Sequence, residues 1–368
     1  MTAESPAESP NNDRLKMSLM FFGDSEDDTT GNKYRLLLES AEFADENGFE
    51  AIWLPERHFT RFGCLYPDPA VLHAALAMQT KRLRLRAGSV VLPLNEPIRV
   101  AEQWSVVDNL SNGRVELAFA SGWHPDDFAL MPDAYDDRYQ RMLRGIEDVQ
   151  QLWHGESIQR QNGAGDSIRL RSYPSPSQTA LPIWLTAAGN PETFRRAGEL
   201  GFDVLTHLFH QDVTELHEKI AVYRKARRHA GHHDPHGRVA VTLHAFVGNT
   251  IGEVKQKAGE PYCEYIKSNL SLLKQLAFSQ KQSVDLESLP SEELDHMIRW
   301  LLDKFIGGRS LMGTVASCAK TCQELAEIGV SEIACLLDFG PNTDDVLAHL
   351  PQLAKLNEQI GTISVNRS

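Results

Sequence analysis

Three consecutive ionisable side chains, Glu56, Arg57 and His58, follow a short apolar run at 51–54. A carboxylate beside an imidazole suits proton transfer, because imidazole titrates near neutral pH. The arginine could hold a substrate carboxylate or phosphate, or an anionic cofactor atom. A surface ion pair between Glu56 and Arg57 would explain the same residues without any chemistry. The motif alone does not separate these interpretations.

Two further apolar runs end in small residues. The run 83–92 contains Gly88 and Ser89, and the run 115–120 is followed by Ser121. Small side chains at the end of a strand let a flat ligand approach the backbone closely. If the strands form a barrel, its narrowing would also require small side chains at these positions, without any ligand.

A third apolar run, 183–186, leads into a turn that could bind phosphate. Asn190 is a good helix N-cap, and Pro191 fits the first helical position. A helix that begins here presents backbone N–H groups and the positive end of its dipole, and Thr193 adds a hydroxyl. Ordinary capping explains the same residues.

These side chains must be positioned by an alternation of strands and helices. Strands are predicted at 17–22, 51–54, 83–92, 115–120, 183–186, 203–206, 239–247 and 333–337. Helices are predicted at 33–47, 69–80, 98–110, 135–153, 192–200, 213–229 and 344–359, with a long helical excursion before the last strand that includes 261–280 and 292–305. Parallel strands need such crossovers, and eight units favour a (β/α)8 barrel over a doubly wound open sheet. Chemistry then belongs at the C-terminal strand ends.

The composition excludes several classes of protein. The 368 residues carry a formal net charge of −13, which argues against binding nucleic acid. No apolar run approaches the roughly 18 residues of a membrane-spanning helix. Residues 1–14 lack the features of a signal peptide, so we expect a disordered tail before a single domain over 15–368. The five cysteines, without a C-x-x-C pair, are expected to be reduced thiols in a cytoplasmic protein.

Other candidate motifs indicate less. The chain has neither a G-x-G-x-x-G turn after a strand nor a P-loop. Four histidines over 229–236 follow a basic helix and are interpreted as a solvated loop, so no metal site is predicted. His207 and His210, just after the sixth strand, are better placed for chemistry.

Taken together, the motifs resemble those of the bacterial luciferase-like flavin-dependent monooxygenases, over residues 17–360. The likeness is carried by W-L-P-E-R-H-F-T-R-F-G at 53–63, G-S-V-V-L-P at 88–93, S-N-G-R at 111–114, S-G-W at 121–123 and A-G-N-P-E-T at 188–193. The closing E-I-A-C-L-L-D-F-G at 332–340 is similar to the subgroup found beside polyketide and nonribosomal peptide synthesis.

This resemblance implies a (β/α)8 barrel that binds FMN, used as reduced FMN from a separate flavin reductase. The cofactor-binding residues that it implies are Ser89, Ser121 and Trp123 for the flavin ring and Gly189, Asn190 and Thr193 for the phosphate. It also implies a homodimer that pairs through helices after the early strands, where the stretch 69–76 is apolar enough for core or interface.

The implied reaction oxygenates an organic substrate with reduced FMN and O2. We expect the substrate to be a natural-product intermediate, free or tethered to a carrier protein. His58 would transfer a proton, Glu56 would orient it, and Arg57 would hold an anionic group. Hydroxylation and Baeyer–Villiger insertion both remain open.

Two departures from the luciferases narrow this expectation. The luciferases have two adjacent histidines after the glutamate, whereas this chain has Arg57 and then His58, and their reactive cysteine is replaced by Ala120. We therefore expect flavin binding but not aldehyde oxidation with light emission. The alternatives are an oxidoreductase of the same fold that uses the deazaflavin F420, and a non-catalytic flavin-binding protein.

Overall fold

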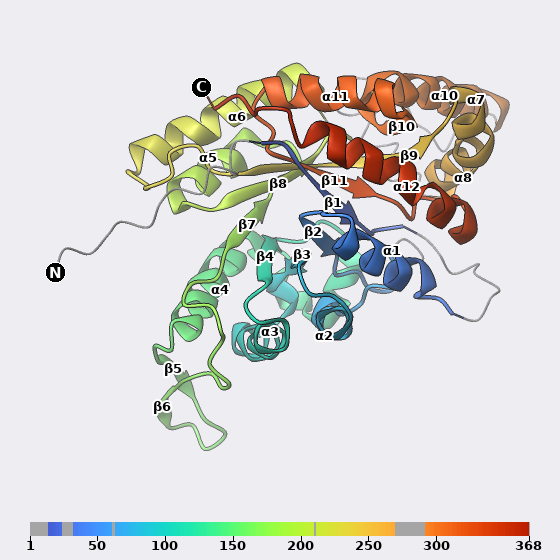
Figure 1. The fold of residues 1–368 in the computed structure, drawn as a ribbon. Helices are drawn as coiled ribbons and strands as arrows, with labels where there is room; N and C mark the ends of the chain where they lie inside the picture. The colour runs from blue at the N-terminus through green and yellow to red at the C-terminus, as the bar shows by residue number, and fades with distance from the viewer. Residues whose placement is uncertain (1–13, 24–31, 61–62, 210, 269–290, 368) are drawn as a thin grey trace.

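The computed structural model describes residues 14–23, 32–60, 63–209, 211–268 and 291–367. Within them, eight parallel strands close into a barrel surrounded by helices (Figure 1). In order around the barrel, these strands are β1 (Lys16–Met20), β2 (Ala51–Leu54), β3 (Arg84–Val91), β4 (Val115–Ala120), β7 (Ile183–Thr186), β8 (Asp203–His207), β9 (Val239–Gly248) and β11 (Glu332–Leu336). Pairing of β8 with β9 and of β11 with β1 completes the ring. The predicted barrel is confirmed, and each predicted strand end lies within two residues of the observed one.

Helices cover the barrel, and each of them except α11, which follows β10 (Leu311–Thr314), was predicted from the sequence. They are α1 (Arg35–Glu46), α2 (Pro69–Gln79), α3 (Pro97–Ser111), α4 (Arg138–Trp153), α5 (Pro191–Leu200), α6 (Val213–His229), α11 (Val315–Glu327) and α12 (Thr343–Ile360). Side-chain caps fix where several begin: Asp68 caps α2, Asn190 caps α5, and Asp212 forms a capping box with Glu215 on α6. Local sequence therefore sets the turns that follow the strands.

A charged network fills the barrel near the N-terminal ends of its strands. Arg86 Nη1 donates to both carboxylate oxygens of Glu332 at 2.7 Å, and Arg86 Nε lies 2.9 Å from Glu116 Oε2. Trp184 Nε1 donates to the same Glu116 oxygen at 2.8 Å. Burial alone would raise the pKa of Glu116, but Arg238 and Arg86 beside it lower this pKa to about 2. Buried charges are tolerated when they are paired in this way, so we interpret the network as structural. The candidate catalytic residues lie at the opposite, C-terminal ends of the strands.

Between β9 and β11 the chain leaves the barrel, as the sequence predicts. It forms α7 (Ile251–Val254), α8 (Glu260–Ser268) and α10 (Ser291–Lys304), which lie at one end of the molecule (Figure 1), and π-helical turns at Lys255–Gly259 and Phe305–Arg309. The predicted helix at 261–280 is observed to Ser268, and its remainder lies outside the described residues.

This excursion also contains a strand that the sequence did not predict, β10 (Leu311–Thr314). Strand β9 is ten residues long: its residues 240–244 pair with β11, and 245–248 pair with β10. The short β10 is thus an addition to the extended end of β9.

A short hairpin completes the architecture. The strands β5 (Ile158–Gln161) and β6 (Ser167–Leu170) form an antiparallel hairpin that projects from the barrel (Figure 1). No disulfide joins the five cysteines, all of which lie in the described part of the chain. None of the helices described has the length and apolarity to cross a bilayer.

Candidate functional site

The carboxylate of Glu56, just after β2, is fixed by groups from the end of β3. Its Oε2 accepts a hydrogen bond from Val91 N at 2.7 Å, and its Oε1 accepts one from Asn95 Nδ2 at 2.9 Å. His58 Nε2 lies 3.3 Å from Glu56 Oε1. Glu56 is buried, whereas the His58 side chain keeps 15% of its surface exposed. The arrangement holds an imidazole at the barrel mouth with one of its nitrogens on a fixed carboxylate.

Arg57 contacts Asp127 rather than Glu56, and both Glu56 and Arg57 are buried, so the structure does not form the surface ion pair that the sequence left open. Its Nη1 lies 3.4 Å from Asp127 Oδ2, and its guanidinium carbon lies 4.9 Å from the centre of the Trp123 ring. Burial lowers the pKa of Arg57, and the carboxylate of Asp127 acts in the opposite direction. Asp127 belongs to the turn Pro125–Leu130 after β4 and was not predicted as a site residue.

The small residues at the ends of β3 and β4 lie where the sequence predicted them. Ser89 is buried, and its hydroxyl lies 2.5 Å from the Thr186 hydroxyl at the end of β7. Ser121 follows β4, and Trp123 keeps 43% of its surface exposed. A Cβ at Gly122 would lie within 2.9 Å of Val91 and Phe128, so only glycine allows this close approach. Thr186, which the sequence analysis missed, is the last residue of its strand.

The predicted phosphate turn has the expected cap. The Asn190 side chain accepts a hydrogen bond from Glu192 N at 3.0 Å, and Thr193 N donates to Asn190 O at 3.1 Å. These two N–H groups are therefore already used, contrary to the expectation that the helix start presents them to an anion. Gly189 has φ of +155°, which favours glycine, and apart from its chain neighbours the position of a Cβ on it has one neighbour within 4 Å among the described residues.

That neighbour is Lys219 Nζ on α6, at 3.8 Å. Lys219 donates to Gln211 Oε1 at 2.8 Å, and Gln211 Nε2 donates to Thr206 Oγ1 at 2.9 Å. Thr206 in turn donates to Ala187 O at 2.6 Å, just before the turn. Burial lowers the pKa of Lys219, while nearby carboxylates raise it. A chain of hydrogen bonds thus holds an ammonium group beside Gly189, and nothing in the spacing of the sequence indicated it.

A second carboxylate lies at the end of the last barrel strand. Asp338 is 3% exposed; its Oδ1 accepts a hydrogen bond from Phe22 N at 2.8 Å, and its Oδ2 accepts one from Tyr66 Oη at 2.7 Å. Burial raises the pKa of Asp338 to about 6, although these hydrogen bonds act in the opposite direction. The group ties the ends of β1 and β11 to the segment after β2.

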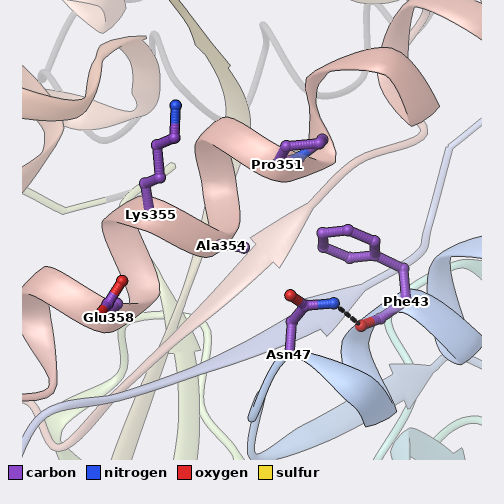
Figure 2. Close-up of a pocket in the computed structure, with 6 residues that line it drawn as sticks. All are labelled: Phe43, Asn47, Pro351, Ala354, Lys355 and Glu358. Atoms are coloured by element: carbon purple, nitrogen blue, oxygen red, sulfur yellow. Dashed lines mark hydrogen bonds between the residues drawn. The ribbon is translucent and has the colours of Figure 1, made fainter.

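Of the two histidines predicted after the sixth barrel strand, β8, the structure describes one. His207 Nδ1 lies 3.2 Å from Phe209 N, which donates to it, and His210 lies outside the described residues. A separate groove is lined by Phe43, Asn47, Pro351, Ala354, Lys355 and Glu358 (Figure 2). It lies between the C-terminal halves of α1 and α12, at the end of the barrel opposite the strand exits, so it is not part of the candidate site.

The side chains at the strand exits fit a flat ring that carries a phosphate tail. The paired hydroxyls of Ser89 and Thr186 offer polar groups to a ring at the strand exits, and the turn at Gly189 with Lys219 beside it offers a place for an anion. An FMN molecule has this form. The residues suited to hold it are Ser89 and Thr186 at the ring and Gly189, Thr193 and Lys219 at the phosphate.

Comparison with known proteins identifies a family and several relatives. Residues 14–332 match the family model described as luciferase-like monooxygenase. The oxygenase component of the flavin-dependent trigonelline monooxygenase of Acinetobacter baylyi is 32% identical over 198 residues, 52% of this chain and 54% of that protein. The 4-hydroxyprotoasukamycin monooxygenase of Streptomyces nodosus subsp. asukaensis is 30% identical over 166 residues, 45% of this chain and 44% of that protein. The matched segments therefore span about half the length of these relatives.

A solved structure extends the likeness of the fold to almost the whole chain. The oxygenating constituent of 3,6-diketocamphane monooxygenase from Pseudomonas putida, in complex with FMN, superposes with a TM-score of 0.77. The match is 19% identical and covers 96% of this chain and 100% of that one. At this identity the likeness shows a shared barrel.

Proposed function

The chain belongs to the luciferase-like monooxygenase family, and from that premise we propose that it is an FMN-dependent monooxygenase that oxygenates an organic substrate with reduced FMN and O2. The observation that carries the proposal is the two-part site at the strand exits. Small residues at the end of β3 adjoin the Ser89–Thr186 hydroxyl pair, and Lys219 faces the open turn at Gly189. A ring site and an anion site on one barrel mouth match the two ends of FMN.

The residues around the flavin position and protect the reactants. When bound, reduced FMN supplies the electrons that activate O2. Ser89 and Thr186 supply hydroxyls beside the ring, and Lys219 and the Thr193 hydroxyl bind the phosphate. The barrel mouth must also exclude water, because oxygen activated without a nearby substrate is lost as hydrogen peroxide.

Proton transfer is assigned to His58. Glu56 is held by Val91 N and Asn95 Nδ2, so it fixes the imidazole through its Nε2. In the tautomer with the proton on Nε2, that nitrogen donates to Glu56 Oε1 and Nδ1 is left as the acceptor. Glu56 is thus a positioning residue, and His58 moves the proton between substrate and solvent.

Arg57 holds an anionic group at the same mouth. Asp127 and the face of Trp123 fix the guanidinium, which stays charged in spite of its burial. The group that it binds is a substrate carboxylate or phosphate, or the anionic edge of the reduced flavin.

The partners follow from the same proposal. A separate reductase supplies reduced FMN in the cytoplasm, and the substrate is a natural-product intermediate, free or carrier-bound. The name of the trigonelline relative, an oxygenase component, supports the separate reductase, and that of the protoasukamycin relative supports a natural-product substrate.

The chain forms a homodimer through the outer faces of α2 and α3. These two helices lie in contact, and their exposed faces carry Val71, Met78, Val106 and Leu110, which are 64%, 72%, 43% and 42% exposed. The sequence left open whether the segment 69–76 belongs to the core or to an interface. Leu76 is buried in the core, whereas Val71 is exposed on the outer face. Apolar side chains gathered on neighbouring helices are typical of an interface.

The test supplies the protein with NADH, a flavin reductase, FMN and candidate substrates, and measures oxygen uptake together with oxygenated product. Product that contains one atom of ¹⁸O from ¹⁸O2 supports the proposal. Turnover with reduced F420 and no oxygen uptake would support the deazaflavin alternative instead. FMN binding without any substrate-dependent turnover across carrier-bound and free candidates would indicate a flavin-binding protein.

A further inference from the structure

A buried histidine in the barrel mouth lies among aromatic rings. His244 is the last residue of β9 that pairs with β11, and its ring contacts five others with centroid distances between 5.2 and 6.0 Å. These rings come from the segments after β8 and β11, from α8 and from the π-helical turn after α10: Phe209, Phe339, Tyr262, Tyr265 and Phe305. We call these five residues the aromatic wall. Side chains from distant parts of the chain thus converge on one imidazole.

The hydrogen bonding of His244 sets it apart from other buried histidines. The side chain is 6% exposed, and its Nε2 has no hydrogen-bond partner among the residues that the structure describes. His73 Nδ1 contacts Pro69 O at 2.7 Å, and His349 contacts Asp345 O and Glu253. Buried polar groups in folded proteins nearly always have partners. The Nε2 of His244 therefore has hydrogen-bonding capacity that a ligand group could use.

The aromatic wall accounts for part of this deficit. The rings of Phe339 and Tyr262 are nearly perpendicular to the imidazole, at 88° and 90°. An N–H group directed at such a face gains a weak interaction. Only one imidazole nitrogen can carry that proton when the ring is neutral, so the other is left as a hydrogen-bond acceptor.

The charge state limits what this partner can be. Burial lowers the pKa of His244 to about 3 and raises the pKa values of Tyr262 and Tyr265. All three groups are therefore neutral at physiological pH. A carboxylate or phosphate placed here would lose its hydration without gaining a counter-charge. The surroundings favour a neutral, flat and largely apolar ligand.

The aromatic wall belongs to the same mouth as the candidate catalytic residues. Phe339 follows Asp338, whose carboxylate accepts the hydrogen bond from Phe22 N. The Phe22 ring in turn lies 6.0 Å from the guanidinium carbon of Arg57. A molecule held at His244 would therefore share the barrel mouth with Arg57 and the residues beside it.

We propose that His244 is a substrate-binding residue that supplies a hydrogen bond beside the aromatic wall, and that the substrate bears a neutral aromatic or conjugated ring with a hydroxyl or carbonyl group. This inference rests on the proposed oxygenase function, because the bound molecule is a substrate only if the protein is an oxygenase. It assigns the neutral ring to His244 and leaves any anionic part of the substrate to Arg57.

The test compares two probes of nearly equal shape, 4-fluorophenol and 4-fluorotoluene, which differ in a hydroxyl and a methyl group. Their dissociation constants on the full-length protein are measured by ¹⁹F NMR. We expect the wild type to bind 4-fluorophenol about fivefold more tightly, the size of one neutral hydrogen bond. His244→Phe should remove this preference and leave 4-fluorotoluene affinity within about twofold. Should His244→Phe fail to fold, His244→Met removes the same group and should give the same loss.

Tyr262→Phe and Tyr265→Phe are the matched controls, because they keep the rings and remove other hydroxyls from the same wall. Both should retain the preference for 4-fluorophenol. The inference is overturned if neither probe binds, if the wild type shows no preference, if a folded His244 variant keeps it, or if a tyrosine variant abolishes it. Oxygen uptake with FMN and a reductase, measured on the same preparations, reports on the proposed function independently of probe binding.

Discussion

His58 Nε2 lies 3.3 Å from Glu56 Oε1, and that carboxylate is itself held by Val91 N and Asn95 Nδ2. A side chain just after the second barrel strand is thus positioned by groups at, and just after, the end of the third. This connection explains why Glu56 is buried while His58 still reaches the mouth.

His58→Ala should lower product formation about tenfold or more, equivalent to at least ~1.4 kcal/mol of transition-state stabilisation. FMN affinity and folding should be nearly unchanged, and hydrogen peroxide per NADH should rise as product falls. Glu56→Gln should also lower product formation and raise hydrogen peroxide, but by less, because the imidazole remains. Normal coupling in a well-folded His58 variant would remove this residue from the mechanism.

Thr193→Glu should weaken FMN binding several-fold or more, because it places a carboxylate against the phosphate. Lys219→Met should weaken it in the same direction, since it removes the ammonium beside Gly189. Equilibrium titration of each variant measures the effect. Affinity for riboflavin, which has no phosphate, serves as the control and should change little. Equal losses for FMN and riboflavin would contradict the phosphate assignment.

Asp338 should make the stability of the protein depend on pH. Its pKa is raised from 3.8 to about 6 in the fold, so the folded state binds a proton more tightly than the unfolded chain. The stabilisation from this proton is fully present below about pH 4 and is lost as the pH rises through 6, by at most about 3 kcal/mol.

The measurement is the free energy of unfolding of the wild type minus that of Asp338→Asn, followed from pH 4 to 7. This difference should fall as the pH rises. Tyr66→Phe removes a hydrogen bond that lowers the pKa of Asp338. When the same difference is measured with Tyr66→Phe in both proteins, it should therefore continue to fall to a higher pH. A flat or rising difference would show that the carboxyl is not protonated in this window.

Met78→Asp should dissociate the proposed homodimer. Met78 is 72% exposed on α2, so the charge costs little in the monomer but would be buried at the interface. Light scattering at micromolar concentration should give a dimer mass for the wild type and a monomer mass for the variant. Ile168→Asp, on the projecting hairpin, places the same charge at another exposed apolar position and should leave the dimer intact. A wild-type monomer would refute the proposal.

Most of the barrel could be predicted because its strands are short apolar runs separated by capped helices. The caps at Asp212 and Asn190, for example, are local signals that a sequence displays directly. Strand β10 was missed because four residues paired with an overhang of β9 have no periodicity of their own.

The site was predicted less completely, for a physical reason. Glu56 and His58 follow a strand and Ser89 lies near the end of one, so a barrel brings them to one end whatever their partners are. Lys219 and His244 act through contacts between segments far apart in the chain, and no spacing in the sequence records these contacts.

The most direct measurement of the central claim is the anaerobic binding of three reduced cofactors to the wild-type protein: FMN, riboflavin and F420. The account predicts that reduced FMN binds at least about tenfold more tightly than reduced riboflavin, because Lys219 and Thr193 recognise its phosphate. It also predicts weaker binding of F420 than of FMN. Equal affinity for FMN and riboflavin, or tighter binding of F420, would contradict it.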